Sequence, residues 1–258
     1  MFLTDFSRPR ILIIAGPNGS GKSTITRGIP ICGIYVNADD IKRISHCTDL
    51  EAAQEAEQIR QMLLKSHKDF TFETVLSTDR NLKLLQEAKE QGYEIHAVFV
   101  LTNDPYINVE RVKYRAKAGG HDVPEEKILS RYERSLRNLS RLVRIADYTR
   151  VIDNSGDKPH LICEVLEQQI TIWETPQWSK KAILRLYLSH APFGGNVVGI
   201  DAAAWRYFNR DVSCLSWAEL CCLAVLPNSP ALIHPGRNGM SLKHKRDGLL
   251  RSLHKAGV

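Results

Sequence analysis

The sequence predicts an α/β fold, in which a parallel sheet carries helices on both faces, followed by a mainly α-helical C-terminal segment. Two observations lead to this fold class. Short apolar runs alternate with helical patterns over residues 10–168, as in strands that are joined by crossover helices. The first apolar run leads directly into a glycine-rich turn with the pattern G-x-x-x-x-G-K-[ST].

This glycine-rich turn is a P-loop, and its surroundings fit that interpretation. Residues 11–15 read ILIIA, a continuous apolar run typical of a parallel strand buried on both faces. Glycines let the backbone wrap closely around a phosphate, and the following helix start adds N–H groups to the anion site. The expected nucleotide-binding residues are Gly16, Pro17, Asn18, Gly19, Ser20, Gly21, Lys22, Ser23 and Thr24. In such a loop Lys22 reaches the β- and γ-phosphates of ATP or GTP, and Ser23 holds Mg²⁺.

The remaining elements of the first part follow in order. A helix is predicted from about Lys22, and the amphipathic helix at 79–91 ends at Gly92, a natural helix stop. Pro124 suits the first turn of a helix, with Glu125 and Glu126 at its positive end. Strands are predicted at residues 33–37, 69–74, 95–101 and 149–153, and helices at 39–44, 50–68, 105–118, 124–145 and 157–168.

A change in charge marks the domain boundary. Residues 1–177 carry 24 Lys and Arg against 25 Asp and Glu, whereas residues 178–258 carry 11 against 4. The sequence therefore predicts a P-loop domain at 1–178 and a basic tail at 179–258, with helices at 180–190 and 216–225. Segments 192–196 and 227–238 are rich in turn residues. The basic tail favours acidic partners, but its composition alone does not indicate nucleic-acid binding.

Composition favours a cytoplasmic protein. No apolar run approaches the ~20 residues that span a bilayer, and the N-terminus lacks the layout of a signal peptide. The six cysteines form no C-x-x-C pair, which favours reduced thiols over a zinc site. Cys221 and Cys222 lie in an apolar helical pattern and are expected in the core.

Acidic residues follow the second and third predicted strands, where the ligand crevice of an open α/β sheet lies. A carboxylate there can accept the proton of a hydroxyl that attacks the γ-phosphoryl group. We expect Asp39 to be this base and Asp40 to cap the next helix, with the reverse order as the alternative. Glu73 would hold a substrate hydroxyl or a metal-bound water, unless it is simply an exposed strand end.

The segment around Gly119-Gly120 predicts a lid. Arg115 and Arg131 flank this turn and would neutralise phosphate charge in the transition state. Their alternative is a solvated basic helix face, because arginine recurs through residues 131–144. His121 lies in the same turn, and the expected substrate-binding residues are Asp40, Glu73, Thr74 and His121.

A P-loop alone is compatible with several nucleotide-using classes. No N-K-x-D base-reading motif of a GTPase is found, and Thr102-Asn103-Asp104 after the fourth strand is an imperfect Walker-B end. In order, the segments IIAGPNGSGKST, VNADDI, FETVLS, GYEIHAVFVLT, ERVKYRAKAGGHDVP, RYERSLRNL, ADYTRVIDNSG and a closing P-x-W resemble the zeta-toxin family of small P-loop kinases.

This resemblance covers about Arg10 to Trp178 and implies a nucleotide-kinase-like fold. It implies phosphorylation of a small-molecule hydroxyl, in the better-known members that of a UDP-N-acetylamino sugar, and control by a small antitoxin protein. By position, Lys22 and Ser23 match the nucleotide and Mg²⁺ residues, and Asp39 matches the catalytic aspartate. Arg115 and Arg131 match the phosphate-contacting arginines.

The tail resembles a different family. Its segments, among them APFGGN, GIDAA, YF and LAVLP, are similar to the later half of the peptidoglycan glycosyltransferase domain of penicillin-binding proteins. That chemistry needs a glutamate in an E-D-x-x-F-x-x-H-x-G segment, which this sequence does not contain. The tail is therefore expected to be a noncatalytic helical appendage or a fusion remnant.

Three hypotheses follow for the whole chain. The leading one is a zeta-toxin-type kinase that uses ATP or GTP with Mg²⁺. The second is a nucleotide-binding module whose basic tail recruits an anionic partner such as nucleic acid or a membrane surface. The third is a fusion with an inert tail, and a transglycosylase ranks last because its catalytic glutamate is missing.

Overall fold

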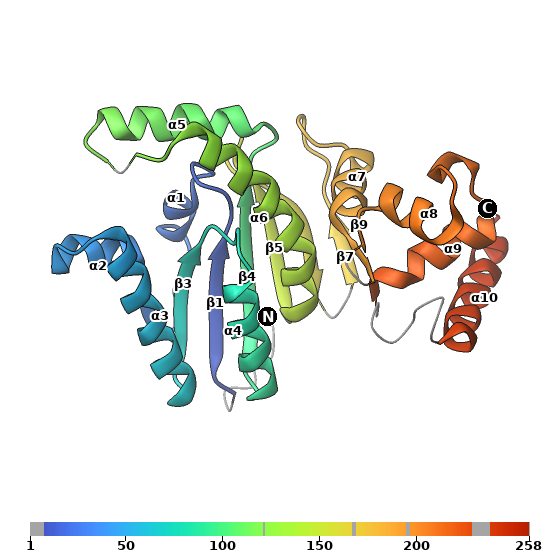
Figure 1. Ribbon diagram of the computed structural model, residues 1–258, viewed down its shortest axis with the longest axis horizontal. Helices are drawn as coiled ribbons and strands as arrows, with labels where there is room; N and C mark the ends of the chain where they lie inside the picture. The colour runs from blue at the N-terminus through green and yellow to red at the C-terminus, as the bar shows by residue number, and fades with distance from the viewer. Residues whose placement is uncertain (1–7, 121, 167–168, 195–196, 229–237, 258) are drawn as a thin grey trace. The chain divides into compact units, whose positions relative to one another are not determined.

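A mostly parallel sheet of seven strands forms the centre of the first part of the chain, within the residues that the computed structural model describes (8–120, 122–166, 169–194, 197–228 and 238–257). The strand order is β2-β3-β1-β4-β5-β6-β7. Figure 1 labels β3, β1, β4, β5 and β7 of this sheet. The strands are β1 (Arg10–Ala15), β2 (Ile34–Val36), β3 (Phe70–Thr74), β4 (Glu94–Leu101), β5 (Tyr148–Asp153), β6 (His160–Leu166) and β7 (Gln169–Ile172).

The inner strands are parallel and apolar, as the predicted fold class requires. β1 pairs with β3 on one side and β4 on the other, and β4 pairs with β5. Ile13 and Ile14 point to opposite faces of the sheet, and both are fully buried. The sheet is therefore covered on both sides, which explains why β1 and β4 read as continuous apolar runs.

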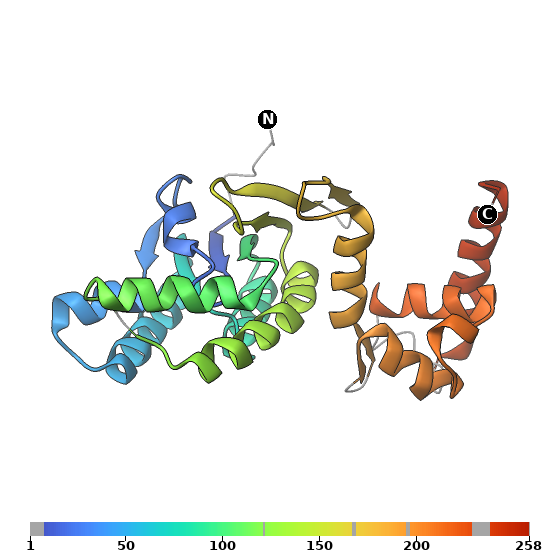
Figure 2. The same cartoon turned by 90° about the horizontal axis from the view of Figure 1, so that it is seen from above.

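Helices connect the strands. They are α1 (Lys22–Thr26), α2 (Ala38–Ser45), α3 (Asp49–Lys65), α4 (Arg80–Glu90), α5 (Pro105–Lys117) and α6 (Glu125–Ile145). Helices α3, α4 and α6 lie on one face of the sheet, and α1 lies on the other (Figure 2). On the α1 face, Ile25 and Ile29 pack against Ile14, Val98 and Val100. The predicted fold class is confirmed.

The helix predicted at 157–168 is wrong, because these residues form a strand instead. β6 (His160–Leu166) runs antiparallel to β5 and is followed by the antiparallel β7. Ile162 and Val165 of β6 are buried, and Arg150 of β5 pairs with Glu164 across the strands (3.3 Å). β-Branched residues fit such a half-buried pleated surface, and the sheet edge that β5 offers outweighs the local helical pattern.

The chain divides into two compact units, Met1–Lys180 and Lys181–Val258, and the second is mainly helical. Strand β8 (Pro192–Gly194) lies in the predicted turn-rich segment 192–196 and pairs antiparallel with β9 (Val197–Val198), which follows that segment. Most of the other turn-rich segment, 229–237, lies outside the described residues. The α-helices of this second part of the chain, within the described residues, are α7 (Lys180–His190), α8 (Ile200–Phe208), α9 (Trp217–Val225) and α10 (Gly239–Lys255). Of these, α8 and α10 were not predicted.

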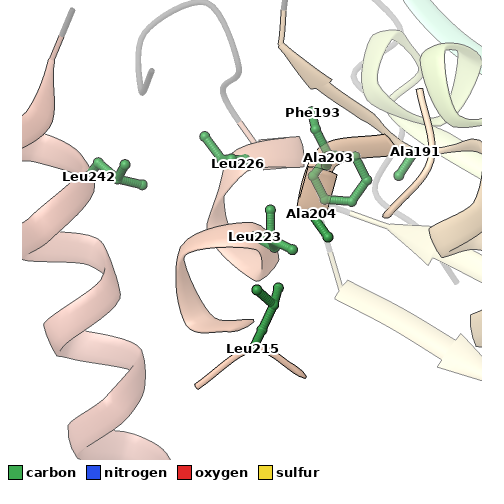
Figure 3. Packing of buried hydrophobic residues seen from close by; sticks show 8 residues of the cluster. All are labelled: Ala191, Phe193, Ala203, Ala204, Leu215, Leu223, Leu226 and Leu242. Atoms are coloured by element: carbon green, nitrogen blue, oxygen red, sulfur yellow. The ribbon is translucent and has the colours of Figure 1, made fainter. Parts of the chain in front are cut away.

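The second unit has a hydrophobic core of its own (Figure 3). Phe193 is fully buried, and Tyr207 donates a hydrogen bond to its carbonyl oxygen (2.9 Å). Cys221 is buried, whereas Cys222 is only partly buried, and all six cysteines are free. The core cluster consists of Ala191, Phe193, Ala203, Ala204, Leu215, Leu223, Leu226 and Leu242.

These separate cores predict separate unfolding transitions. Phe193→Ala should destabilise the second unit by about 3–5 kcal/mol, because a fully buried phenylalanine leaves a cavity when it is truncated. Phe99→Ala, which removes an equally buried ring from β4, should destabilise only the first unit. Guanidinium unfolding followed by circular dichroism would show this as one shifted midpoint per variant. A single transition that both variants shift equally would contradict it.

Candidate functional site

The P-loop connects the end of β1 to the start of α1, so its residues lie at the carboxyl edge of the sheet. Gly21 adopts φ +89° directly before the first helical residue, Lys22. The loop is fixed to the neighbouring strand β3, because the Gly16 N–H donates to the Thr74 carbonyl oxygen (3.2 Å). This is the strand–loop–helix arrangement that a phosphate cradle requires.

Lys22 lies at the mouth of this loop. Its Nζ donates to the carbonyl oxygens of Gly16 (2.8 Å) and Pro17 (2.9 Å). Burial lowers the pKa of Lys22 to about 8; the charges of Glu73 and Asp39 oppose this shift, and that of Arg115 adds to it. The structure thus brings together around Lys22 charged residues that lie far apart in the sequence.

Glu73 accepts hydrogen bonds from three side chains next to Lys22. Its carboxylate accepts hydrogen bonds from Ser23 Oγ (3.2 Å), Thr26 Oγ1 and the Tyr35 hydroxyl (2.8 Å). Asn37 Nδ2 donates in turn to the Tyr35 oxygen (2.9 Å). Glu73 is therefore not a mere exposed strand end.

The sequence reasoning missed Thr26 and Tyr35. Burial raises the pKa of the Tyr35 phenol, and the hydrogen bond to Glu73 raises it further, so the phenol remains a neutral donor. Tyr35 and Asn37 lie two residues apart at the end of β2, so their side chains point to the same side of the sheet. The alternation of side chains along β2 is the sequence feature that could have predicted Tyr35 beside Asn37.

The two aspartates after β2 lie in the first turn of α2. Neither of them caps this helix, so the expectation that Asp40 is the cap is wrong. Asn37 is the N-cap, and its side chain accepts a hydrogen bond from the Asp39 N–H (2.9 Å). Asp40 instead pairs with Arg43 (2.7 Å), one turn further along α2. The helix begins at Ala38, whereas an Asp40 cap requires it to begin at Ile41, so both aspartates lie inside it.

Thr74 lies at the end of β3 and is bound by its own loop. Its Oγ1 accepts hydrogen bonds from the Leu76 N–H (3.0 Å) and from Asn81 Nδ2 (2.7 Å). Leu76 is buried with φ +56°, a strained conformation for a leucine, and Asn138 Nδ2 holds its carbonyl oxygen (2.9 Å). The loop after β3 is therefore rigidly placed beside Glu73.

The predicted lid residues lie on α5 and α6. Arg131 of α6 reaches the P-loop, where its Nη1 donates to Asn18 Oδ1 (3.4 Å). Arg115 lies near the end of α5, and its charge acts on Lys22. Lys113 and Glu125 form a salt bridge between the two helices (3.0 Å). His121 lies outside the described residues.

The zeta-toxin family profile matches residues 33–162, which is half of the chain, and the chain therefore belongs to this family. This membership and the fold make it a P-loop protein of the kinase type, which implies the use of a nucleotide. A second profile, described as transglycosylase, matches residues 156–254.

Curated relatives match parts of this chain. An uncharacterized protein of Haemophilus influenzae is 30% identical over 129 residues, which cover 48% of this chain and 92% of that protein. Penicillin-binding protein 1C of Escherichia coli (strain K12) is 41% identical over 80 residues, 31% of this chain and 10% of its own length. A biosynthetic peptidoglycan transglycosylase of Salmonella schwarzengrund is 38% identical over 147 residues, 54% of this chain and 61% of its own length. This chain thus spans only part of these two cell-wall proteins.

Among solved structures, the AvrRxo1-ORF1:-ORF2 complex with ATP is similar in fold, with a TM-score of 0.52 and 16% sequence identity. The alignment covers 66% of this chain and 62% of that chain. Among the helices of the described residues, none is both long enough and apolar enough to span a membrane.

The lowered pKa of Lys22 predicts how phosphate binding depends on pH. A triphosphate stabilises the ammonium form, so affinity for tripolyphosphate should fall as pH rises through the free-site value of about 8. Above pH 8 the loss should approach about tenfold per pH unit. In Lys22→Arg the guanidinium stays charged, so the affinity should be nearly flat from pH 7 to 9. Titration calorimetry at several pH values would measure both, and equal slopes would contradict the assignment.

Proposed function

We propose that this chain transfers the γ-phosphoryl group of ATP or GTP to a hydroxyl of a small molecule, with a UDP-N-acetylamino sugar as the candidate acceptor. The observation that carries the proposal is the convergence of Lys22, Ser23, Glu73 and Asp39 at the carboxyl edge of the sheet. A cation, a hydroxyl and two carboxylates in one place match the parts that phosphoryl transfer needs. The acceptor class comes from the zeta-toxin family.

The P-loop and its neighbouring cations would hold the donor. Backbone N–H groups at the start of α1 and the Lys22 ammonium would bind the β- and γ-phosphates. Arg131 lies at Asn18 of the loop, and Arg115 acts on Lys22, so both arginines are close enough to the cradle to neutralise developing charge. The ammonium is costly in the free site because it is partly buried, so a bound phosphate would restore its charge.

Asp39 is the better candidate for the base. Asp40 is engaged by Arg43, whereas Asp39 is exposed on the first turn of α2 and its charge reaches Lys22. A base must lie within reach of the acceptor hydroxyl while that hydroxyl faces the γ-phosphate. Asp40, Glu73, Thr74 and His121 remain the proposed contacts to the acceptor.

The residues around Ser23 fit Mg²⁺. Ser23 Oγ and Glu73 Oε2 lie 3.2 Å apart, and hydroxyl and carboxylate oxygens are the ligands that Mg²⁺ prefers. We assign Ser23 as a direct ligand and Glu73 as a direct or water-mediated one. Bound Mg²⁺ would neutralise charge on the β- and γ-phosphates. Without Mg²⁺, the hydrogen bond between Ser23 Oγ and Glu73 Oε2 holds both side chains in place.

An antitoxin protein is the proposed partner, and the cytoplasm the proposed location, because nucleotide is available there. One solved structure of similar fold, the AvrRxo1-ORF1:-ORF2 complex with ATP, supports both a protein partner and an ATP donor. Nucleic acid is not proposed as a substrate.

We also propose that residues 179–258 form a noncatalytic unit. The transglycosylase profile matches residues 156–254, and these residues contain no E-D-x-x-F-x-x-H-x-G segment.

A chain that ends after Lys180 should therefore bind MgATP with unchanged affinity in calorimetry, because the proposed site lies entirely in the first unit. A loss of binding by a folded truncated chain would show that the second unit contributes to the site.

Asp39→Asn tests the mechanism directly. It should lower kcat for phosphoryl transfer by roughly 10²- to 10⁴-fold, because the amide cannot accept the hydroxyl proton, while MgATP binding persists. Asp40→Asn should act mainly on the KM of the acceptor. The measurement is transfer of labelled phosphate from ATP to UDP-N-acetylglucosamine.

Asp157→Asn is the matched control, because Asp157 is exposed in the turn before β6 and should leave the rate unchanged. A wild-type chain that binds MgATP but labels no UDP-sugar would remove this acceptor class. Normal turnover by Asp39→Asn would remove Asp39 as the base.

A further inference from the structure

Two asparagine side chains from outside the P-loop hold its backbone carbonyl groups. Asn108 of α5 donates from Nδ2 to the carbonyl oxygen of Asn18 (2.7 Å). Asn154, the first residue after β5, donates from Nδ2 to the carbonyl oxygen of Ser20 (2.8 Å). Neither asparagine belongs to the P-loop pattern or to the charged residues around Lys22. We call this pair, Asn108 and Asn154, the amide clamp.

The orientation of the Asn108 amide is fixed by its other partner. Thr102, directly after β4, donates its hydroxyl to Asn108 Oδ1, which leaves Nδ2 to face Asn18. Asn108 and Thr102 are fully buried, and the Tyr132 hydroxyl of α6 holds the Thr102 carbonyl oxygen. A flipped amide would set Oδ1 against the Asn18 carbonyl oxygen, and two acceptors cannot bond to each other.

Asn154 is equally fixed through its backbone. Its N–H donates to the Leu101 carbonyl oxygen of β4 (2.9 Å), and its own carbonyl oxygen accepts from Arg111 Nη1 of α5 (2.8 Å). The side chain therefore starts from a position set by β4 and α5 together. A preorganised donor of this kind holds its acceptor at little entropic cost.

The clamp also explains why two P-loop positions must be glycine. Gly19 and Gly21 have φ of +78° and +89°, values that side-chain-bearing residues rarely adopt. A Cβ on Gly19 would lie 2.4 Å from the Asn108 carbonyl oxygen. A Cβ on Gly21 would lie 2.2 Å from Asn154 Nδ2. The absence of these Cβ atoms is what lets both asparagines approach the loop.

From this geometry we infer that Asn108 and Asn154 are positioning residues that aim the P-loop N–H groups at the nucleotide phosphates. In a planar trans peptide the C=O and the following N–H point in opposite directions. Holding the Asn18 and Ser20 carbonyl groups against the clamp therefore turns the N–H groups of Gly19 and Gly21 away from it. Turned away from the clamp, these N–H groups would point towards the phosphates in the proposed nucleotide site. The inference rests on the proposed nucleotide site and adds its orienting residues.

The amide clamp also connects the P-loop to α5, the helix that carries the predicted lid residue Arg115. Asn108, Arg111 and Arg115 lie on the same helix, α5, and the first two act on the P-loop and on Asn154. A movement of α5 would therefore release the Asn18 carbonyl group as well as withdraw an arginine.

Asn154→Ala is the decisive variant, because Asn154 is only partly buried and its loss leaves no large cavity. Removal of its donor should weaken the binding of MgATP and of tripolyphosphate by about tenfold in calorimetry. In the transfer assay, KM for ATP should rise by a similar factor while kcat at saturating ATP stays near the wild-type value. Asn154→Asp, which sets a carboxylate against the Ser20 carbonyl oxygen, should bind more weakly still.

Asn103→Asp is the matched control, since Asn103 is exposed at the same sheet edge and the variant carries the same added charge as Asn154→Asp. It should bind tripolyphosphate as the wild type does. Asn108→Ala tests the other asparagine of the amide clamp. Because Asn108 is buried, the melting temperature of this variant is measured as well.

Wild-type affinity in a folded Asn154→Ala would overturn the inference while leaving the proposed kinase intact. Equal losses in Asn154→Asp and Asn103→Asp would overturn it too, because charge alone would then explain the effect. A wild-type chain that binds neither ATP nor tripolyphosphate would instead overturn the proposed function, and the inference with it.

Discussion

The parallel pairing of β1 between β3 and β4 is the constraint on which the site depends. Ala15 lies opposite both Thr74 and Phe99, and Leu101 lies opposite Asp153. The residues that follow these strands therefore start from one edge of the sheet, as in open α/β folds that bind ligands there. A shift in register would separate Glu73 from Ser23 even if every local element still formed. The chemistry of the site is thus a consequence of strand pairing more than of any single motif.

At that edge, burial and charge act against each other on Lys22. Burial disfavours its ammonium, the carboxylates of Glu73 and Asp39 favour it, and the Arg115 guanidinium disfavours it again. Burial is the largest of these effects, so Lys22 loses its proton more easily in the free site than a lysine does in water. In the proposed site, a bound triphosphate would supply the negative charge that stabilises the ammonium. This imbalance favours binding of polyanions over binding of neutral molecules at the same site.

The sequence was a good guide to those elements that local pattern decides, and a poor one to those that tertiary pairing decides. The apolar runs of β1 and β4 and the P-loop glycines are visible in one dimension, and the fold class is confirmed. The β6 strand was missed because its residues suit a helix until β5 offers them an edge. The α2 cap was misplaced by a few residues, since Asn37 and Asp40 are both good caps. Tyr35, Asn108 and Asn154 are neutral residues that match no binding pattern, and only the tertiary fold reveals what their side chains touch.

The two family profiles overlap at residues 156–162, and the structure shows what this overlap means. Strands β6 (His160–Leu166) and β7 (Gln169–Ile172) lie inside the transglycosylase match, yet they pair with the kinase-type sheet through β5. The compact units separate only at Lys180 and Lys181, so the sequence boundary and the structural boundary differ. β-Branched apolar residues such as Ile162 and Val165 suit any half-buried strand, whatever sheet provides the partner. The first part of the transglycosylase match therefore forms the antiparallel edge of the sheet, whereas residues from Ala191 onward pack with Phe193 in a core of their own.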